Sequence, residues 1–220
     1  MKNWLVAALA VAGVSGVVVS TVDCGKSESH RLPDPIDRAI SMSPTPQPND
    51  AFKKASRVAI KHAADKQSAS ISLSPKPTTI EAMLKAVRPD DLAGDISTEA
   101  YQFKRVAPFE TTNWQVSANV TEVVLRSDGD YYLVIEDGKG HRSVVEVPDP
   151  KLCADSTKLK EITSARKAIE AKFHPTAQPK KVNVKARVTG LGFFGMARSR
   201  DGKKPGNGAR IMPGLKVEWL

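Results

Sequence analysis

Asp128 and Asp130 are the residues whose type and spacing come closest to catalytic chemistry. They stand on either side of Gly129, between two apolar runs. Metal-assisted phosphodiester cleavage needs several carboxylates on one ion, together with arginines that hold the developing charge. An Asp-Gly pair between apolar runs is also a common hairpin-turn sequence. The turn accounts for the motif by itself, so the sequence predicts no catalytic residue here.

The other metal-ligating and nucleophilic residues are scattered. The four histidines are His30, His62, His141 and His174, and no two of them stand at the spacing of a ligand pair. The chain has no Gly-rich phosphate loop and no nucleophile elbow. Cys153 follows a Pro-rich corner, which favours a small structural thiol, and its only possible disulfide partner is Cys24. We therefore expect no metal site and no cofactor.

Positive charge is the stronger functional signal. The chain of 220 residues has a formal net charge of +9, which favours contact with polyanions such as nucleic acid or acidic glycans. A cationic loop near the C-terminus is suited to hold phosphate or sulfate groups, and two tyrosines on an earlier strand offer a stacking surface. A solvated flexible loop is the alternative. The candidate ligand-binding residues are Arg198, Arg200, Lys203, Lys204, Arg210, Tyr131 and Tyr132.

The first 22 residues predict export from the cytoplasm. Lys2 precedes an apolar run from Trp4 to Val22, and Asp23 ends it, which is the order of a signal peptide. The run is also close to the length of about 20 residues that spans a bilayer, so an uncleaved membrane anchor is the alternative. Lipidation at Cys24 is disfavoured, because the residues before it depart from a lipobox. We expect the folded part to be periplasmic, secreted or membrane-anchored.

Residues 23–77 are expected to form a linker with one short helix. The first half of this segment carries five prolines among Ser and Asp, a composition that neither buries a core nor favours a helix. Apolar residues at helical spacing predict the short helix near residues 51–66. A capping box from Thr78 to Glu81 then predicts a second helix, which ends before Pro89.

Residues 78–220 are expected to form one domain that is mainly β with helices, an α+β fold. Alternating apolar residues and turn sequences predict three consecutive strands, a helix with one apolar face, and two further strands. The predicted elements are strands near 114–125, 131–135 and 142–147, a helix near 156–173, and strands near 182–188 and 211–219.

This order of elements matches the OB-fold, a five-stranded Greek-key barrel whose helix lies between strands three and four. A split-sheet α+β domain would give the same order. OB-folds commonly bind ligands over strands two and three and with the loops that join strands one to two and four to five. The cationic loop joins predicted strands four and five, and Tyr131 and Tyr132 lie at strand two. The candidate residues therefore fall where OB-folds bind ligands.

Four stretches of this domain resemble a family of uncharacterised exported bacterial proteins with an OB-like, staphylococcal-nuclease-like barrel. The stretches are Phe109–Val116, Asp128–Asp137, Val145–Cys153 and Val188–Phe194, within about residues 78–220. The resemblance implies the barrel and export, but no established reaction. Members typically carry histidines and acidic residues after the double Phe, whereas this chain carries Gly195 and basic residues. An activity that depends on those residues in members is not expected here.

The sequence therefore predicts an exported, non-catalytic OB-fold binding or interaction module. Its expected partner is a polyanion, either nucleic acid or acidic glycan, or an envelope protein, with membrane association through residues 1–22. The alternative is a degenerate or unrecognised metal-dependent phosphodiesterase or nuclease-like enzyme, because Asp128-Gly129-Asp130 resembles the Asp-Gly-Asp of staphylococcal-type nucleases. The Arg-Leu and Val-Asp-x-Pro-Glu elements that complete that pattern are absent, which favours the binding module.

Overall fold

The computed structural model describes residues 57–92, 101–195 and 206–220. The predicted export segment 1–22, residues 23–56 of the predicted linker, and the cations Arg198, Arg200, Lys203 and Lys204 lie outside these ranges. Within the described ranges, no helix has both the length and the apolar character needed to cross a membrane.

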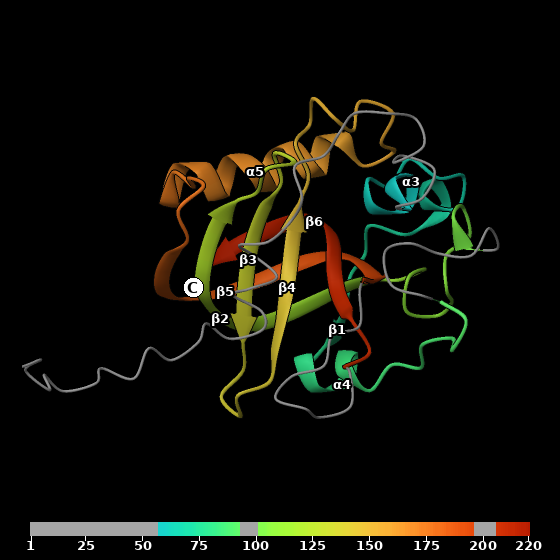
Figure 1. Cartoon of the computed structure of the whole chain (residues 1–220), viewed down its shortest axis with the longest axis horizontal. Helices are drawn as coiled ribbons and strands as arrows, with labels where there is room; N and C mark the ends of the chain where they lie inside the picture. The colour runs from blue at the N-terminus through green and yellow to red at the C-terminus, as the bar shows by residue number, and fades with distance from the viewer. Residues whose placement is uncertain (1–56, 93–100, 196–205) are drawn as a thin grey trace, which may run out of the picture. The chain divides into compact units, whose positions relative to one another are not determined.

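The described part is a mixed α+β fold with a six-stranded sheet and few helices, which confirms the predicted fold class at this level (Figure 1). Short elements come first: α3 (Val58–Lys61), a 3₁₀ helix (Ser68–Ser70), β1 (Lys76–Thr78) and α4 (Ile80–Leu84). The main elements are β2 (Asn113–Leu125), β3 (Tyr131–Glu136), β4 (Arg142–Val147), α5 (Leu159–Phe173), β5 (Lys180–Phe194) and β6 (Ala209–Trp219).

Two boundaries differ from the sequence predictions. In the region predicted as a helix near 51–66, the described helix is α3, which has only four residues. The cap of α4 is Thr79, whose Oγ1 accepts a hydrogen bond from the Ala82 N–H at 3.1 Å. Thr78 is not the cap, because it is the last residue of β1 and pairs with Val116.

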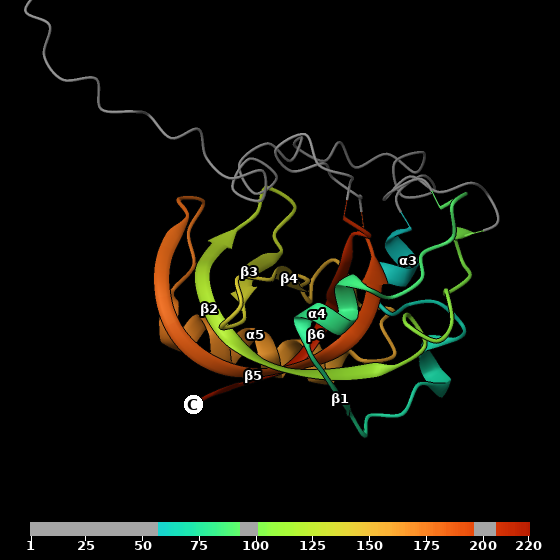
Figure 2. The ribbon, with the colours of Figure 1, turned by 90° about the horizontal axis from the view of Figure 1, so that it is seen from below.

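β2 organises the sheet because it pairs with three other strands. The sheet order is β1-β2-β3-β4-β6-β5, and β2 and β5 also pair with each other. The pairings of β2 with β3 and β5 are antiparallel, whereas β1 runs parallel to β2 (Figure 2). β4 meets β6 in parallel at Val145 and Ile211.

A bulge divides β2 into two halves. The register shifts between Val120 and Glu122, so Thr121 is the extra residue. Val120 and Val123 therefore both point into the core although they are three residues apart. After the bulge, alternation turns Glu122 away from the core.

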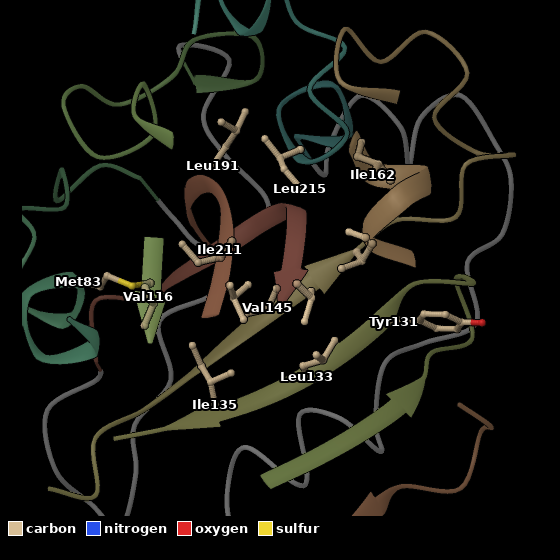
Figure 3. Packing of buried hydrophobic residues seen from close by; sticks show 14 of the residues in the cluster. Met83, Val116, Tyr131, Leu133, Ile135, Val145, Ile162, Leu191, Ile211 and Leu215 are labelled. Carbon is tan, nitrogen blue, oxygen red and sulfur yellow. The ribbon is translucent and has the colours of Figure 1, made fainter. Parts of the chain in front are cut away.

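The main core lies between the sheet and α5. The helix has apolar residues at three- and four-residue spacing, which places them on one face, and this face packs against the strands. The core includes Val120 and Ile169. Figure 3 labels further members of it, among them Val116, Leu133, Ile135, Val145, Ile162, Leu191, Ile211 and Leu215.

Residues before β1, which fall in the predicted linker, are held by two buried ion pairs. Arg57 Nη2 lies 2.6 Å from Glu110 Oε2, and Arg105 Nη2 lies 2.7 Å from Asp65 Oδ2, with all four side chains nearly free of solvent contact. Ala63 of the same segment belongs to the main core. The segment from residue 57 onwards is therefore packed against the sheet domain.

Removing the Glu110 carboxylate should strongly destabilise the protein. Glu110→Ala leaves the Arg57 guanidinium buried without its counter-charge, which costs about 3–5 kcal/mol in the free energy of unfolding. Urea denaturation followed by circular dichroism measures this loss. The double variant Arg57→Met/Glu110→Leu should recover much of the stability, because no charge is then left unpaired. A loss below about 1 kcal/mol in the single variant would contradict the assigned role.

Gly192 is required by a close backbone approach. A Cβ at this position would overlap the carbonyl oxygen of Phe109, which cannot move aside as a flexible side chain would. Gly192→Ala should therefore lower the free energy of unfolding by about 2 kcal/mol or more. Gly138→Ala is the matched control, because its Cβ would meet nothing within 4 Å, and its effect should stay within about 0.5 kcal/mol. Equal effects of the two substitutions would refute this explanation.

Candidate functional site

The candidate site lies on the face of β3 and β4 that points away from the main core, here called the outer face. Tyr131 belongs to the core, whereas Tyr132 and Val134 form a separate cluster with Val124 of β2. Tyr132 is directly paired with Glu146 of β4. Strand alternation therefore places Tyr132 and Glu146 side by side on the outer face.

Arg210 of β6 joins these two residues. Its Nη1 donates a hydrogen bond to Oε1 of Glu146, which is 1 % exposed. Burial raises the pKa of Tyr132 well above its ordinary value, and the Glu146 carboxylate raises it further. Arg210 and Tyr132 were both predicted as ligand-binding residues, and the structure brings them together around Glu146.

Tyr131 does not join Tyr132 in a common stacking surface. Its side chain lies among the core residues (Figure 3), and its hydroxyl donates a hydrogen bond to Glu170 of α5. The guanidinium of Arg166, also on α5, lies 3.7 Å from the centre of the Tyr131 ring. Tyr131 thus fixes α5 to β3. The other candidate ligand-binding residues, Arg198, Arg200, Lys203 and Lys204, lie outside the described residues.

Arg126 is the outer-face residue that sequence reasoning missed. It follows β2, its guanidinium carbon lies 5.0 Å from the centre of the Tyr132 ring, and only 4 % of the residue is exposed. In the described part of the chain, nothing accepts a hydrogen bond from its Nε or Nη2. The strand register indicates its position. Val124 pairs with Tyr132, and Arg126 stands two residues beyond Val124, so it lies on the same face of the sheet.

Asp128 stabilises the hairpin turn between β2 and β3. Its Oδ1 accepts a hydrogen bond from the Asp130 N–H at 3.2 Å, and the Arg126 carbonyl accepts one from the Gly129 N–H. Gly129 has φ of +86°, a conformation that a side chain would disfavour. These are the contacts of a turn, which the non-catalytic interpretation of Asp-Gly-Asp expects.

Asp130 is the most perturbed carboxyl group of the site. Burial, followed by the nearby charges of Asp128 and Glu146, raises its pKa to about 8. The N–H of Asp149 donates to Asp130 Oδ1 at 3.2 Å and opposes this shift only in part. Asp130 is therefore mainly protonated and neutral at pH 7, where an ordinary aspartate is charged.

The end of α3 faces this carboxyl cluster. Burial lowers the pKa of His62 to about 4, and the charge of Lys61 lowers it further, while Asp128 acts in the opposite direction. The Lys61 ammonium also favours the ionised form of Asp130. His62 is consequently neutral at pH 7 and serves as a polar neighbour of the turn.

Cys153 contributes a protonated thiol at the edge of the same cluster. Its Sγ donates to the Asp149 carbonyl at 3.3 Å. Burial and the charges of Asp130 and Asp149 raise the pKa of Cys153 to about 11. A nucleophilic cysteine needs a lowered pKa, so this thiol has the character of the structural one predicted from the sequence.

In the described ranges, no group of three or more His, Cys, Asp or Glu side chains is arranged to hold a metal ion. The carboxyl groups near the turn are instead occupied by backbone N–H groups and by Arg210. Comparisons of the chain with models of protein families, with curated proteins and with solved structures find no match.

The raised pKa of Asp130 makes the protein less stable as the pH rises. Above about pH 4 the Asp130 carboxyl keeps its proton in the folded state but loses it in the unfolded state. The free energy of unfolding therefore falls as the pH rises from about 4 to about 8. Between pH 6.5 and 8 the free energy of unfolding should fall by about 1 kcal/mol. His62 opposes this only weakly, because its stabilising effect is nearly complete above pH 6.5.

Urea unfolding of the native chain and of Asp130→Asn at both pH values measures the effect. The variant should lose the decline, because its amide carries no titrating proton. Asp155→Asn, at an exposed aspartate, is the control and should keep it. A decline of the same size in Asp130→Asn would show that another group is responsible.

Proposed function

We propose that β2 to β6 form an OB-like Greek-key barrel and that the chain is related to the exported proteins that it resembles. Three observations support the barrel: β2 pairs with both β3 and β5, β4 meets β6 in parallel, and α5 lies between β4 and β5 in the chain. In such a barrel the outer face of β3 and β4 is the usual ligand-binding face, and the connection between β5 and β6 is one of the usual binding loops.

We further propose that the protein is an exported, non-catalytic binding module whose ligand is a polyanion, either nucleic acid or an acidic glycan. The observation that carries this proposal is the meeting of Tyr132 and Arg210 around Glu146 on the outer face. Arg210 also ends the segment that contains Arg198, Arg200, Lys203 and Lys204. An aromatic ring beside an arginine suits a ligand that carries both charged groups and flat surfaces. The second proposed class of partner is an envelope protein whose acidic surface binds the same residues.

The acidic residues of the site do not oppose an anionic ligand at neutral pH. Asp130 is mainly protonated, because burial and its neighbours raise its pKa to about 8. Glu146 is paired with Arg210. Asp128 accepts one hydrogen bond within the turn, from the Asp130 N–H. The negative charge of the cluster is therefore smaller than the number of its carboxyl groups suggests.

The alternative proposal, a metal-dependent phosphodiesterase, keeps Asp128 and Asp130 as its centre. The observation that favours it is the perturbed pKa of Asp130 beside two other carboxyl groups, because such shifts are common at catalytic sites. The occupation of these carboxyl groups by turn and backbone hydrogen bonds favours the binding module instead.

Fluorescence anisotropy with labelled single-stranded DNA, single-stranded RNA and heparin tests the binding module. At least one of these ligands should bind at low salt, and its affinity should fall as salt increases. Arg210→Gln should weaken binding by about threefold to tenfold, which corresponds to one lost charge contact. Lys160→Gln, on the exposed side of α5, is the matched control and should have little effect. Absence of binding to all three ligands at low salt would contradict the polyanion proposal.

The same mixtures with and without Mg²⁺ or Ca²⁺ separate the two proposals. A binding module leaves the nucleic acid intact under both conditions. Metal-dependent cleavage that disappears in Asp128→Ala would establish the enzyme and refute the non-catalytic assignment.

A further inference from the structure

Arg88, which follows α4, joins the end of β5 to the residues that lead into β6. Its Nη1 donates hydrogen bonds to the carbonyl of Gly195 at 2.5 Å and to the carbonyl of Asn207 at 2.9 Å. Its Nε and Nη2 donate to the carbonyl of Leu92. The Gly195 N–H also donates to the Gly208 carbonyl at 3.0 Å. The Arg88 guanidinium therefore fixes two backbone segments against each other.

Asn207 attaches this junction to α4. Its Nδ2 donates to the carbonyls of Met83 and Ala86, each at 2.9 Å, and its Oδ1 accepts a hydrogen bond from the Ala209 N–H. Carbonyl groups at the end of a helix need partners from outside the helix, and the Asn207 amide supplies one here. The junction is thus tied to α4 by two side chains, Arg88 and Asn207.

The Arg210 guanidinium lies directly against Gly195. A Cβ at Gly195 would lie 2.4 Å from Cζ of Arg210 and 2.5 Å from its Nε and Nη2. Gly208 makes room for Arg88 in a similar way. Its φ is +72°, and a Cβ there would lie 2.5 Å from the Gly195 carbonyl oxygen and 2.8 Å from Arg88 Nη1. The two glycines therefore allow both guanidinium groups to approach the backbone closely.

Arg210 is thus held by Gly195 as well as by Glu146, the buried carboxylate to which it donates. Its side chain is 16 % exposed, so part of it remains in contact with solvent. A freely moving arginine loses side-chain entropy when it binds an anion, whereas an arginine that is already held loses less. The position of the Gly195 backbone therefore affects how well Arg210 is prepared for binding.

We propose that Arg88 is a positioning residue for Arg210. It keeps the Gly195 backbone where the Arg210 guanidinium rests, so that this guanidinium is oriented toward Glu146 before a ligand arrives. Arg88 acts through backbone carbonyls and needs no contact with the ligand. The consequence for ligand binding rests on the proposed polyanion function, whereas the effect on the Arg210 side chain does not.

NMR relaxation of the arginine Nε–H groups in the full chain tests the positioning directly. The Arg210 Nε–H should have an order parameter of about 0.85, as a rigid backbone has, and Arg88→Gln should lower it below about 0.6. Arg88→Lys should lower it as well, because an ammonium group lacks the fork of donors that a guanidinium has. Arg187→Gln removes an arginine from the middle of β5, where Arg187 pairs with Glu218, and should leave it unchanged.

Gly195→Ala displaces Arg210 without changing Arg88. The added Cβ meets the far end of a flexible side chain, so the protein should stay folded while the Arg210 guanidinium moves away. The order parameter of Arg210 should fall as it does in Arg88→Gln. Gly206→Ala is the matched control, because its Cβ would meet nothing within 4 Å. Thermal unfolding of each variant confirms that it is folded.

Fluorescence anisotropy extends the test to binding, with whichever of single-stranded DNA, single-stranded RNA and heparin binds the native chain most tightly. Arg88→Gln, Arg88→Lys and Gly195→Ala should each weaken binding by about threefold. In a chain that already carries Arg210→Gln, the further change Arg88→Gln should have no effect, because both substitutions remove the same contact.

Two results would overturn the proposal. An unchanged order parameter of Arg210 in both Arg88→Gln and Gly195→Ala would show that Arg88 serves the fold alone. Full affinity in Arg88→Lys, with weakened affinity in Arg88→Gln, would show that Arg88 acts through its charge. Absence of binding to every polyanion would refute the proposed function alone, because the order parameters test the positioning without a ligand.

Discussion

Glu110 accepts four hydrogen bonds in the protein interior. Two come from the guanidinium of Arg57, and the others come from the N–H groups of Val106 and Phe194. A carboxylate has about four acceptor sites, so this buried charge is satisfied. Its donors come from the start of α3, the segment before β2 and the end of β5. This one carboxylate therefore holds α3 on the sheet, and with it Lys61 and His62 beside the hairpin of β2 and β3.

The protein contains the same pair of residue types in two very different states. Arg57 and Glu110 satisfy each other, whereas Arg126 and Glu122 are equally buried but leave donors and an acceptor unused within the described residues. The burial of a charge costs free energy in both cases, and only the first pair recovers it inside the fold. Departures from internal pairing are where function is expected, and Arg126 and Glu122 on the outer face are such departures.

Sequence reasoning succeeded where the signal is local and failed where it is long-range. Alternation and turn residues predicted the long strands, and helical spacing predicted α5, because both periodicities can be recognised within a short stretch of sequence. The pairing of Arg57 with Glu110 joins residues 53 positions apart, and no local pattern contains it. The two tyrosines were predicted as one surface, although alternation puts neighbours on opposite faces; Tyr131 bonds to α5 and Tyr132 faces outward.

The bulge at Thr121 determines which residues reach the outer face. The side-chain period of a strand is two, so one extra residue exchanges the two faces for everything that follows. With the bulge, Val123 enters the core, and Glu122 and Arg126 point outward. Before the bulge, the even-numbered residues of β2 face the core. In an unbroken strand the even-numbered residues after it would face the core as well, so the charged side chains of Glu122 and Arg126 would enter the apolar core. A feature that weakens the ladder locally is thus the feature that allows the outer face to carry charge.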